Sequence, residues 1–525
     1  MGRSIQVFAA VALASTGDTI VVAGPLSVPP QSMPRIATVD ERYQSYNVEM
    51  AEVVGGRFWK PYDQSGQARK HAAPKSRSAS LQIGQDPNLF ESRPPIDLSN
   101  ARLRMLAAAL GPAYVRVSGT WANSVFFHDS DESAPPAPPK GFQNVLTRRE
   151  WAGVIAFSQA VNARLVTSFA ISEGVRDSAS IWTPDQARKL LAATKAAGGE
   201  IAAAEMFNEP TYAAMGGAPP GYDARAFARD FAVFRSFVRA AAPQTIILGP
   251  GSVGEGVTLM PGSLLRTLDL LSAMPRPVFD AFSYHYYGAA SVRCTSLAEG
   301  VVGTTPAAAL SEGWLSRTDQ VNSFYEDLRD RFEPDRPVWI TETADAACGG
   351  NPWAPTFLDT FRYLDQLGRL AKRGVKVVLH NTLASSEYGL LDQKMLAPRP
   401  NYWAALLWRK LMGSSVLDAG PSGSGVHLYA HCLRGGRRGV ALLAINPSRT
   451  QAASIELPAS AERYTLSAWK LEDSNVQLNG RLLELDAGGA LPPLRGVPIP
   501  PGKVELVPTS ITFLSLPDAR NGDCE

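Results

Sequence analysis

The sequence predicts a (β/α)8 TIM barrel followed by a C-terminal antiparallel β-sandwich. Short apolar runs alternate with helical stretches eight times along the chain, and polar and aromatic residues gather where the apolar runs end. Near residue 412 the pattern changes to short alternating runs separated by Gly and Pro. A chain of 525 residues also suits one large domain and a smaller one. We therefore expect the barrel over 41–411 and the sandwich over 412–525.

The eight barrel strands are expected, in chain order, at residues 42–50, 113–117, 164–170, 201–207, 245–248, 278–283, 338–342 and 375–379. Helical spacing of apolar residues and helix start signals place helices between them. Thr147 and Glu150 form a capping box, Thr183-Pro184 opens another helix, and the stretch 224–242 repeats Phe at helical spacing. Residues 55–95 are expected to form a long polar loop.

The N-terminal residues 1–17 have the features of a short export signal. An apolar run follows Arg3, and Ala12-Leu13-Ala14 has the small-x-small form of a processing site. A buried N-terminal strand and a start at another position are the alternatives. Residues 18–40 are expected to be an arm that adds a strand to the sandwich. The export signal leads us to expect a secreted or periplasmic protein. No apolar run approaches the roughly 18 residues that cross a bilayer, so we expect no membrane span.

Composition excludes several classes of function. The 51 basic and 49 acidic residues nearly cancel, so we expect no nucleic-acid partner, and an anionic substrate would have to be recognised locally. Only six His and four Cys are present, without metal-binding or nucleotide-binding spacings, so we expect no metal and no cofactor. A single disulfide is possible, but spacing does not reveal which cysteines would pair.

Glu209 and Glu342 are the candidate catalytic residues. Each ends a short apolar run that is expected to be a buried strand, the fourth and the seventh of the barrel. One carboxylic acid can protonate a leaving glycosidic oxygen, while the other, ionised, attacks the anomeric carbon. We expect an ionised Glu342 to raise the pKa of Glu209, and the two carboxyl groups to lie about 5 to 5.5 Å apart. A solvated or salt-bridged surface glutamate is the alternative for either residue alone.

Residues beside the two glutamates are candidates for holding the sugar. The Asn208 amide can bind a sugar hydroxyl, or else cap the strand turn. Among the aromatic residues 284–287, Tyr286 is the favoured partner for a hydrogen bond to Glu342, although such residues more often form the wall of a sugar site.

Glycines and polar residues near the last two strands are candidates for binding an anion. Consecutive N–H groups at Gly349 and Gly350 can cradle a carboxylate, or they form an ordinary glycine turn. Asn381 and Tyr388, after the eighth strand, are placed to reach a sugar carboxylate and hydroxyls.

Several of these motifs together resemble the heparanase-like enzymes of glycoside hydrolase family 79. They are residues 43–50, Phe207-Asn208-Glu209-Pro210, Tyr284-His285-Tyr286-Tyr287, the segment 342–350 and Asn401-Tyr402-Trp403. The resemblance covers residues 43–417 and implies a retaining β-glucuronidase, with Glu209 as acid/base and Glu342 as nucleophile. It implies that the glucuronate carboxylate is bound by Gly349, Gly350 and Tyr388, and sugar hydroxyls by Asn47, Thr120, Asn208 and Asn381.

Two departures from the family pattern bear on the substrate, which the resemblance implies to be a glucuronide or a glucuronic-acid-containing oligosaccharide. Cys348 stands at the position where the animal heparanases look to have a tyrosine, which bears on one contact to the sugar carboxylate. Residues 249–256 lack the arginines with which the endo-acting relatives grip sulfated chains, and they offer an acid instead. Exo-attack on a terminal glucuronic acid is therefore favoured. An endo-acting heparanase or hyaluronan-type hydrolase and a non-catalytic carbohydrate-binding barrel remain the alternatives.

Overall fold

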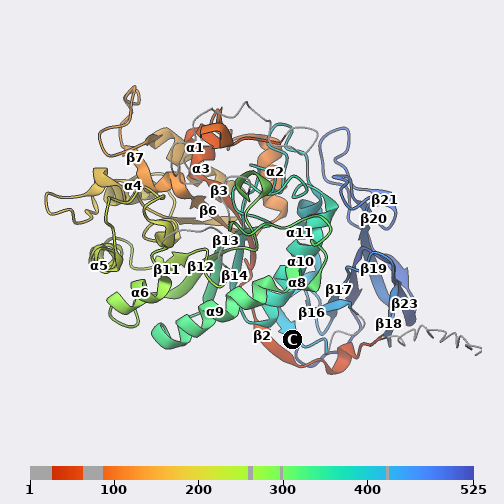
Figure 1. Ribbon diagram of the computed structural model, residues 1–525. Coiled ribbons are helices and arrows are strands. Elements are labelled where there is room, and N and C mark those ends of the chain that lie inside the picture. Colours follow the sequence, from red (N-terminus) through yellow and green to blue (C-terminus); the bar gives the residue numbers. More distant parts are fainter. Residues whose placement is uncertain (1–25, 63–86, 258–263, 296–299, 421–424) are drawn as a thin grey trace, which may run out of the picture.

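The structure is a computed structural model that describes residues 26–62, 87–257, 264–295, 300–420 and 425–525. The expected export signal lies outside these residues. Figure 1 shows a barrel of strands and helices beside a smaller all-β domain.

Eight parallel strands close into a barrel, which confirms the predicted fold class. In chain order they are β3 (Gln44–Glu49), β6 (Ala113–Ser118), β9 (Ala163–Thr167), β10 (Ile201–Ala204), β11 (Ile246–Ser252), β12 (Ala281–Tyr287), β13 (Val338–Ala344) and β14 (Val377–His380). β14 pairs with β3 and closes the ring.

Most of the helices on the outside of the barrel bury one apolar face against it. The helix α5 (Ala224–Ala241) begins at Asp223, whose carboxylate accepts from the Ala226 N–H at 2.8 Å, and it buries Phe227, Phe231 and Phe234 against the strands. The other longer helices are α2 (Ala101–Ala109), α3 (Arg148–Ala160), α4 (Asp185–Ala196), α6 (Thr267–Ala273), α9 (Arg317–Phe332), α10 (Phe357–Lys372) and α11 (Pro400–Leu411). The short ones are α1 (Met50–Val54), α7 (Val292–Thr295) and α8 (Glu312–Leu315).

The C-terminal domain consists of two sheets with an apolar layer between them. A three-stranded sheet holds β1 (Leu26–Ser27), β18 (Ala453–Leu457) and β23 (Gly502–Leu506). The larger sheet holds β2 (Arg35–Thr38), β15 (Met412–Leu417), β16 (His427–Leu433), β17 (Val440–Asn446), β19 (Ala461–Ser467), β20 (Gln477–Leu478), β21 (Arg481–Leu482), β22 (Val497–Ile499) and β24 (Ser510–Leu516). Both sheets therefore include a strand that precedes the barrel in the chain.

The expected polar loop at 55–95 contains regular structure that the sequence analysis did not predict. β4 (Gly56–Trp59) pairs antiparallel with β5 (Phe90–Arg93), and the Trp59 and Phe90 rings lie 4.7 Å apart. A second strand pair, β7 (Val125–His128) with β8 (Asn144–Thr147), follows β6. These strands are only four residues long, and large aromatic side chains rather than a long alternating pattern stabilise the first pair.

The helices α10 and α11 lie between the barrel and the sandwich (Figure 1). α10 is buried on nearly all sides. Its Asp365 accepts hydrogen bonds from His427 at 2.5 Å and from the Tyr429 hydroxyl at 2.6 Å, both on β16. The two domains are therefore joined by a polar contact as well as by apolar packing.

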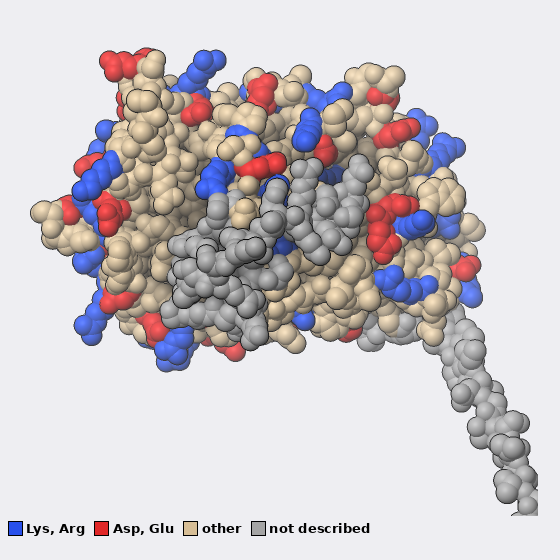
Figure 2. Space-filling model, turned by 45° about the horizontal axis from the view of Figure 1, so that its top comes forward, with Lys and Arg blue, Asp and Glu red and all other residues tan. Residues whose placement is uncertain are grey.

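Four cysteines form two disulfides, Cys294–Cys348 in the barrel and Cys432–Cys524 in the sandwich. On the face in Figure 2, the described basic and acidic side chains are interspersed rather than gathered by sign. None of the described helices combines the length and the apolar character needed to cross a bilayer.

Candidate active site

Two glutamates face each other across a cavity of about 550 Å³ at the carboxyl ends of the barrel strands. Glu209 follows β10, and Glu342 lies near the end of β13. A carboxylate oxygen of Glu209 and one of Glu342 lie within 4.8 Å of each other. The folded barrel thus brings together two acids that are far apart in the chain, as a reaction with one proton donor and one nucleophile requires.

Glu342 is buried and both of its carboxylate oxygens accept hydrogen bonds. Oε1 accepts from the Tyr287 hydroxyl at 2.5 Å and from the Asn381 amide at 3.4 Å. Oε2 accepts from Arg116 Nη1 at 2.9 Å. Donors on both oxygens fix the orientation of the carboxylate toward the cavity.

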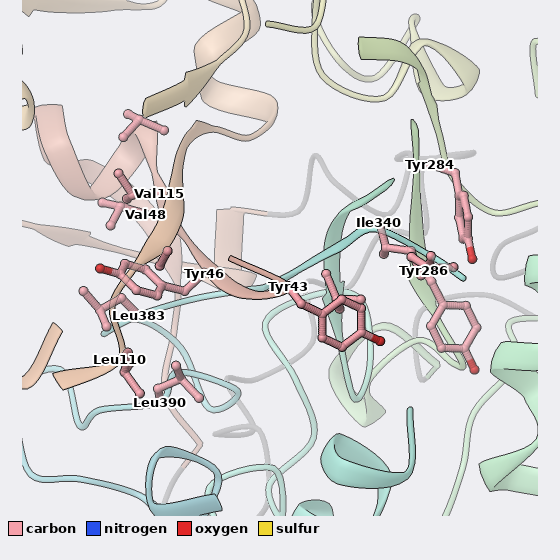
Figure 3. Packing of buried hydrophobic residues seen from close by; sticks show 14 of the residues in the cluster. Tyr43, Tyr46, Val48, Leu110, Val115, Tyr284, Tyr286, Ile340, Leu383 and Leu390 are labelled. Carbon is pink, nitrogen blue, oxygen red and sulfur yellow. The ribbon is translucent and has the colours of Figure 1, made fainter. Parts of the chain in front are cut away.

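The hydrogen bond to Glu342 comes from Tyr287, so the expectation that Tyr286 would make it was wrong. Side chains alternate between the two faces of a strand. His285 and Tyr287 point into the barrel, where they bond Glu209 and Glu342. Tyr284 and Tyr286 belong to the apolar core outside it (Figure 3). Tyr286 is buried there and does not line the cavity.

The backbone holds Glu209 in a conformation that few residues adopt. Its φ is 53°, in the left-handed region, directly before Pro210. The Asn123 side chain, in the short 3₁₀ turn 120–124, accepts from the Asn208 N–H at 2.8 Å and donates to the Asn208 carbonyl at 2.9 Å. This paired amide contact fixes the peptide that presents Glu209 to the cavity.

The pKa of Glu209 is raised above its ordinary value of 4.5. Burial raises it, a hydrogen bond to His285 at 3.0 Å lowers it, and the charge of Glu342 raises it again. The direction agrees with the expectation from the sequence, but burial is the largest cause. The Glu209 carboxyl is therefore suited to hold a proton at a higher pH than an ordinary glutamic acid.

A buried charge network that the sequence analysis did not assign lies beneath the two acids. Arg116 bonds Glu205 at 3.0 Å and Glu342 at 2.9 Å, and it donates to the Asn208 amide oxygen at 2.8 Å. Burial raises the pKa of Glu205, but Arg116, His285 and Thr341 together outweigh burial and hold it well below its usual range. Arg116 and Glu205 interrupt otherwise apolar strand runs, which was the signal that could have identified them.

His285 joins this network from β12. Burial lowers its pKa, but the Glu342 charge and hydrogen bonds to Glu205 and Glu209 raise it to about 9. The imidazolium form therefore persists at neutral pH and donates to Glu209. The positive charges of Arg116 and His285 offset the negative charges of the surrounding carboxylates.

Glu49, at the end of β3, is a third carboxyl group in the cavity wall, and it occupies the place that was expected for Asn47. Asn47 lies one layer deeper, where its amide donates to the Thr341 carbonyl at 3.2 Å, and it does not line the cavity. Burial and the charge of Glu342 raise the pKa of Glu49 well above its usual range. Gly119 leaves the space that Glu49 occupies, since a Cβ there would lie 1.6 Å from its carboxylate.

Four of the other expected residues line the cavity. These are Thr120, Asn208, Asn381 and Tyr388. The Asn381 amide donates to Glu49 at 3.0 Å and lies 3.3 Å from the Tyr388 hydroxyl. The expected residues Gly349 and Gly350 do not themselves line the cavity but stand beside the wall residues Cys348 and Tyr388, and all three residues 348–350 have positive φ.

Trp59, Phe90 and Trp121 form an aromatic side of the cavity that the sequence analysis did not predict. Phe90 lies 4.7 Å from Trp59 and 6.1 Å from Trp121 between ring centroids. Aromatic faces are common platforms for the apolar faces of ligands.

Glu209, His285 and Glu342 are also spaced so that they could hold a metal ion. However, the Glu342 oxygens already accept from Tyr287 and Arg116. A divalent ion would have to displace or oppose the Arg116 guanidinium, so this donor set fits a metal poorly.

Comparisons with known proteins agree on the class. No protein-family model matches the chain. It is 25% identical to heparanase-like protein 1 of Arabidopsis thaliana over 492 residues, which covers 82% of this chain and 86% of the relative. It is 34% identical to baicalin-β-D-glucuronidase of Scutellaria baicalensis over 212 residues, covering 38% and 40%. Among solved structures, a 4-O-α-L-rhamnosyl-β-D-glucuronidase of Fusarium oxysporum superposes with a TM-score of 0.61 at 13% identity, covering 94% of this chain and all of the other.

The barrel, the paired acids and these sequence similarities define a glycoside hydrolase. Within that class the chain is similar to the heparanase-like enzymes of family 79, as its motifs predicted.

Proposed function

We propose that this protein is a retaining β-glucuronidase that removes a terminal glucuronic acid from glucuronides. The observation that carries the proposal is the approach of the Glu209 and Glu342 carboxylates to within 4.8 Å in one cavity. In retaining glycosidases the second carboxylate attacks the sugar directly, so the two carboxyl groups lie only about 5–5.5 Å apart. Inverting enzymes leave room for a water between acids about 6.5–9.5 Å apart.

In the first step, Glu342 attacks the anomeric carbon and forms a glycosyl ester while Glu209 gives its proton to the leaving oxygen. Tyr287 and Arg116 hold Glu342 for this attack. Burial keeps Glu209 protonated at a higher pH than a free glutamic acid.

In the second step, Glu209 accepts a proton from water, which attacks the ester and releases the sugar with its original anomeric configuration. Once Glu342 is esterified, its charge no longer raises the pKa of Glu209. Donation from His285 to Glu209 then favours the carboxylate that must act as a base.

The turn at Gly349 and Gly350 and the Tyr388 hydroxyl would bind the glucuronate carboxylate. Within the described part of the chain, neither glycine N–H donates a hydrogen bond, whereas the carbonyls of both are occupied. Both glycines have positive φ and lie in a turn, and successive backbone N–H groups of a turn can form a concavity that binds an anion. Asn208, Asn381, Thr120 and Glu49 are available for sugar hydroxyls.

The surroundings of the site favour exo-attack on a chain end over cleavage inside a chain. A volume of about 550 Å³ suits a small ligand. Trp59 packs against the Gly349 turn so closely that a Cβ on Gly349 would lie 2.7 Å from it, which supports a closed wall behind the bound acid. The loop after β11 contributes Val253 to the cavity, and its Glu255 bonds Thr267 instead of facing a substrate.

Hydrolysis of an aryl β-glucuronide tests the proposal, with the anomer of the released sugar followed by proton NMR. Glu342→Gln is expected to lower kcat by about 10³-fold or more, because the nucleophile is lost. Glu255→Gln, in the loop after β11, is the matched control and retains activity. An initial α-anomer, or full activity of Glu342→Gln, would overturn the proposal. Size analysis of heparan sulfate digests separates exo-acting from endo-acting enzymes.

We also propose that the protein works outside the cytoplasm, in a secreted or periplasmic location. Two disulfides support an oxidising compartment. N-terminal sequencing of the exported protein tests whether a leader is removed.

A further inference from the structure

The one-turn helix α7 is linked to both sides of the turn that contains Gly349 and Gly350. Two adjacent buried residues make these links: Cys294 through a disulfide to the turn, and Arg293 through groups that in turn bond it. Neither residue lines the cavity. Their effect on a bound substrate would therefore pass through the turn.

On the first side, a disulfide ties Cys294 to Cys348, the residue before Gly349. The Ser291 hydroxyl donates to the Cys348 carbonyl at 3.0 Å, and the Ser291 N–H donates to the Ala347 carbonyl at 3.0 Å. The Val292 N–H donates to Asn351 at 3.1 Å. The entry and the exit of the turn are thus both anchored to the segment that leads into α7.

On the second side, Arg293 pairs with Glu387 at 2.8 Å and donates to the Tyr62 hydroxyl at 3.0 Å. The Glu387 N–H donates to the Gly349 carbonyl at 3.2 Å, and the Tyr62 hydroxyl donates to the Gly350 carbonyl at 3.1 Å. Both carbonyls of the turn are therefore held by groups that Arg293 positions.

We propose that α7 is a positioning element that sets the affinity of the site for the sugar carboxylate, through the Cys294–Cys348 disulfide and the Arg293–Glu387 ion pair. The inference rests on the proposed function, because it assumes that the Gly349–Gly350 turn binds the carboxylate. With its carbonyls and its flanking residues fixed, the turn presents two N–H groups in one arrangement before a ligand arrives. Preorganised donors bind an anion without an ordering cost.

This role predicts a selective defect when the disulfide is removed. Cys294→Ser releases Cys348 and the entry to the turn, while Glu209, Glu342 and their hydrogen-bond partners keep their contacts. Because a hydrogen bond to a charged group weakens steeply when its donor is displaced, the Ki for glucuronic acid as a competitive inhibitor is expected to rise about tenfold or more. The Ki for its methyl ester, which lacks the charge, is expected to change less than about twofold.

The experiment compares these two Ki values, measured against aryl β-glucuronide hydrolysis, with and without dithiothreitol. The double variant Cys432→Ser/Cys524→Ser lacks the other disulfide and is the matched control. Reductant should raise the Ki for glucuronic acid in the wild type and in the control, but not in Cys294→Ser. Arg293→Met with Glu387→Gln, which removes the ion pair without leaving an unpaired charge, should raise the same Ki.

Unchanged Ki values in Cys294→Ser and in the Arg293/Glu387 variant would overturn the inference, as would an equal loss of affinity for the acid and its ester. If Cys294→Ser does not fold, the reduced wild type, checked for native near-ultraviolet circular dichroism, gives the same comparison. A wild type that hydrolyses no glucuronide would refute the proposed function instead, so the two failures are distinguishable.

Discussion

The Tyr287 hydroxyl donates a 2.5 Å hydrogen bond to Glu342 Oε1, whereas the next residue back, Tyr286, faces the opposite side of the same strand. Tyr287→Phe removes this bond to a charged group, which is worth about 1.5–3 kcal/mol. We expect kcat for an aryl β-glucuronide to fall roughly 10- to 150-fold. Tyr286→Phe is the control and leaves kcat within about twofold. Equal effects of the two substitutions would contradict this assignment of the strand faces.

Glu209→Ala should discriminate between leaving groups. A dinitrophenyl leaving group departs without a proton, whereas a phenyl leaving group needs one. The ratio of the steady-state rates, dinitrophenyl over phenyl glucuronide, should therefore be about 10²–10⁴-fold larger in the variant than in the wild type. Azide, which can replace water without a general base, should restore turnover of the dinitrophenyl substrate. Parallel losses with both leaving groups would show that Glu209 is not the acid.

The pH dependence of the reaction should have an alkaline limb set by Glu209. Its pKa is raised by burial, so the acid form persists above the ordinary value of 4.5 and is lost as pH rises through the raised value. We expect kcat/KM for the phenyl substrate to fall over that interval. The limb should be absent from Glu209→Ala with the dinitrophenyl substrate, and its persistence there would assign it to another group.

Glu49→Gln should be tolerated better than Glu49→Ala. The pKa of Glu49 is raised well above its usual range, so a neutral side chain of the same shape resembles the native protonation state. We expect Glu49→Gln to retain kcat/KM within about tenfold. Glu49→Ala also removes the acceptor of the Asn381 amide, which costs about 1–3 kcal/mol more. Comparable losses in both variants would indicate that the carboxylate charge itself is required.

Stability should depend on pH through His427 at the contact between domains. Burial lowers the pKa of His427, but the hydrogen bond and charge of Asp365, with a smaller contribution from Glu312, raise it overall above 6.5, while Arg369 opposes this. Because the folded pKa is raised, this stabilisation is fully present below pH 6.5 and is lost as pH rises through the folded value. Denaturant unfolding of the wild type and His427→Gln should converge at the alkaline end of that interval. A constant difference between them would contradict the prediction.

Sequence reasoning could locate the two catalytic candidates because each ends an apolar run, which marks a strand end in an alternating β/α pattern. It could not assign Tyr286 and Tyr287 to faces of the strand, because β12 is buried on both faces and the two neighbours are the same residue type. It also missed Arg116 and Glu205, which satisfy each other inside the barrel, where isolated charges would be too costly. The strand pair β4–β5 was missed because the aromatic contacts that stabilise it join residues separated by a long stretch of sequence.

The burial of α10 on nearly all sides constrains how this enzyme can be divided or recombined. A truncation after residue 411 would expose apolar side chains of α10 and leave Asp365 without its partners on β16. The catalytic barrel is therefore not a transplantable module, and fusion proteins or chimaeras should exchange the two domains, together with the N-terminal strands, as one unit.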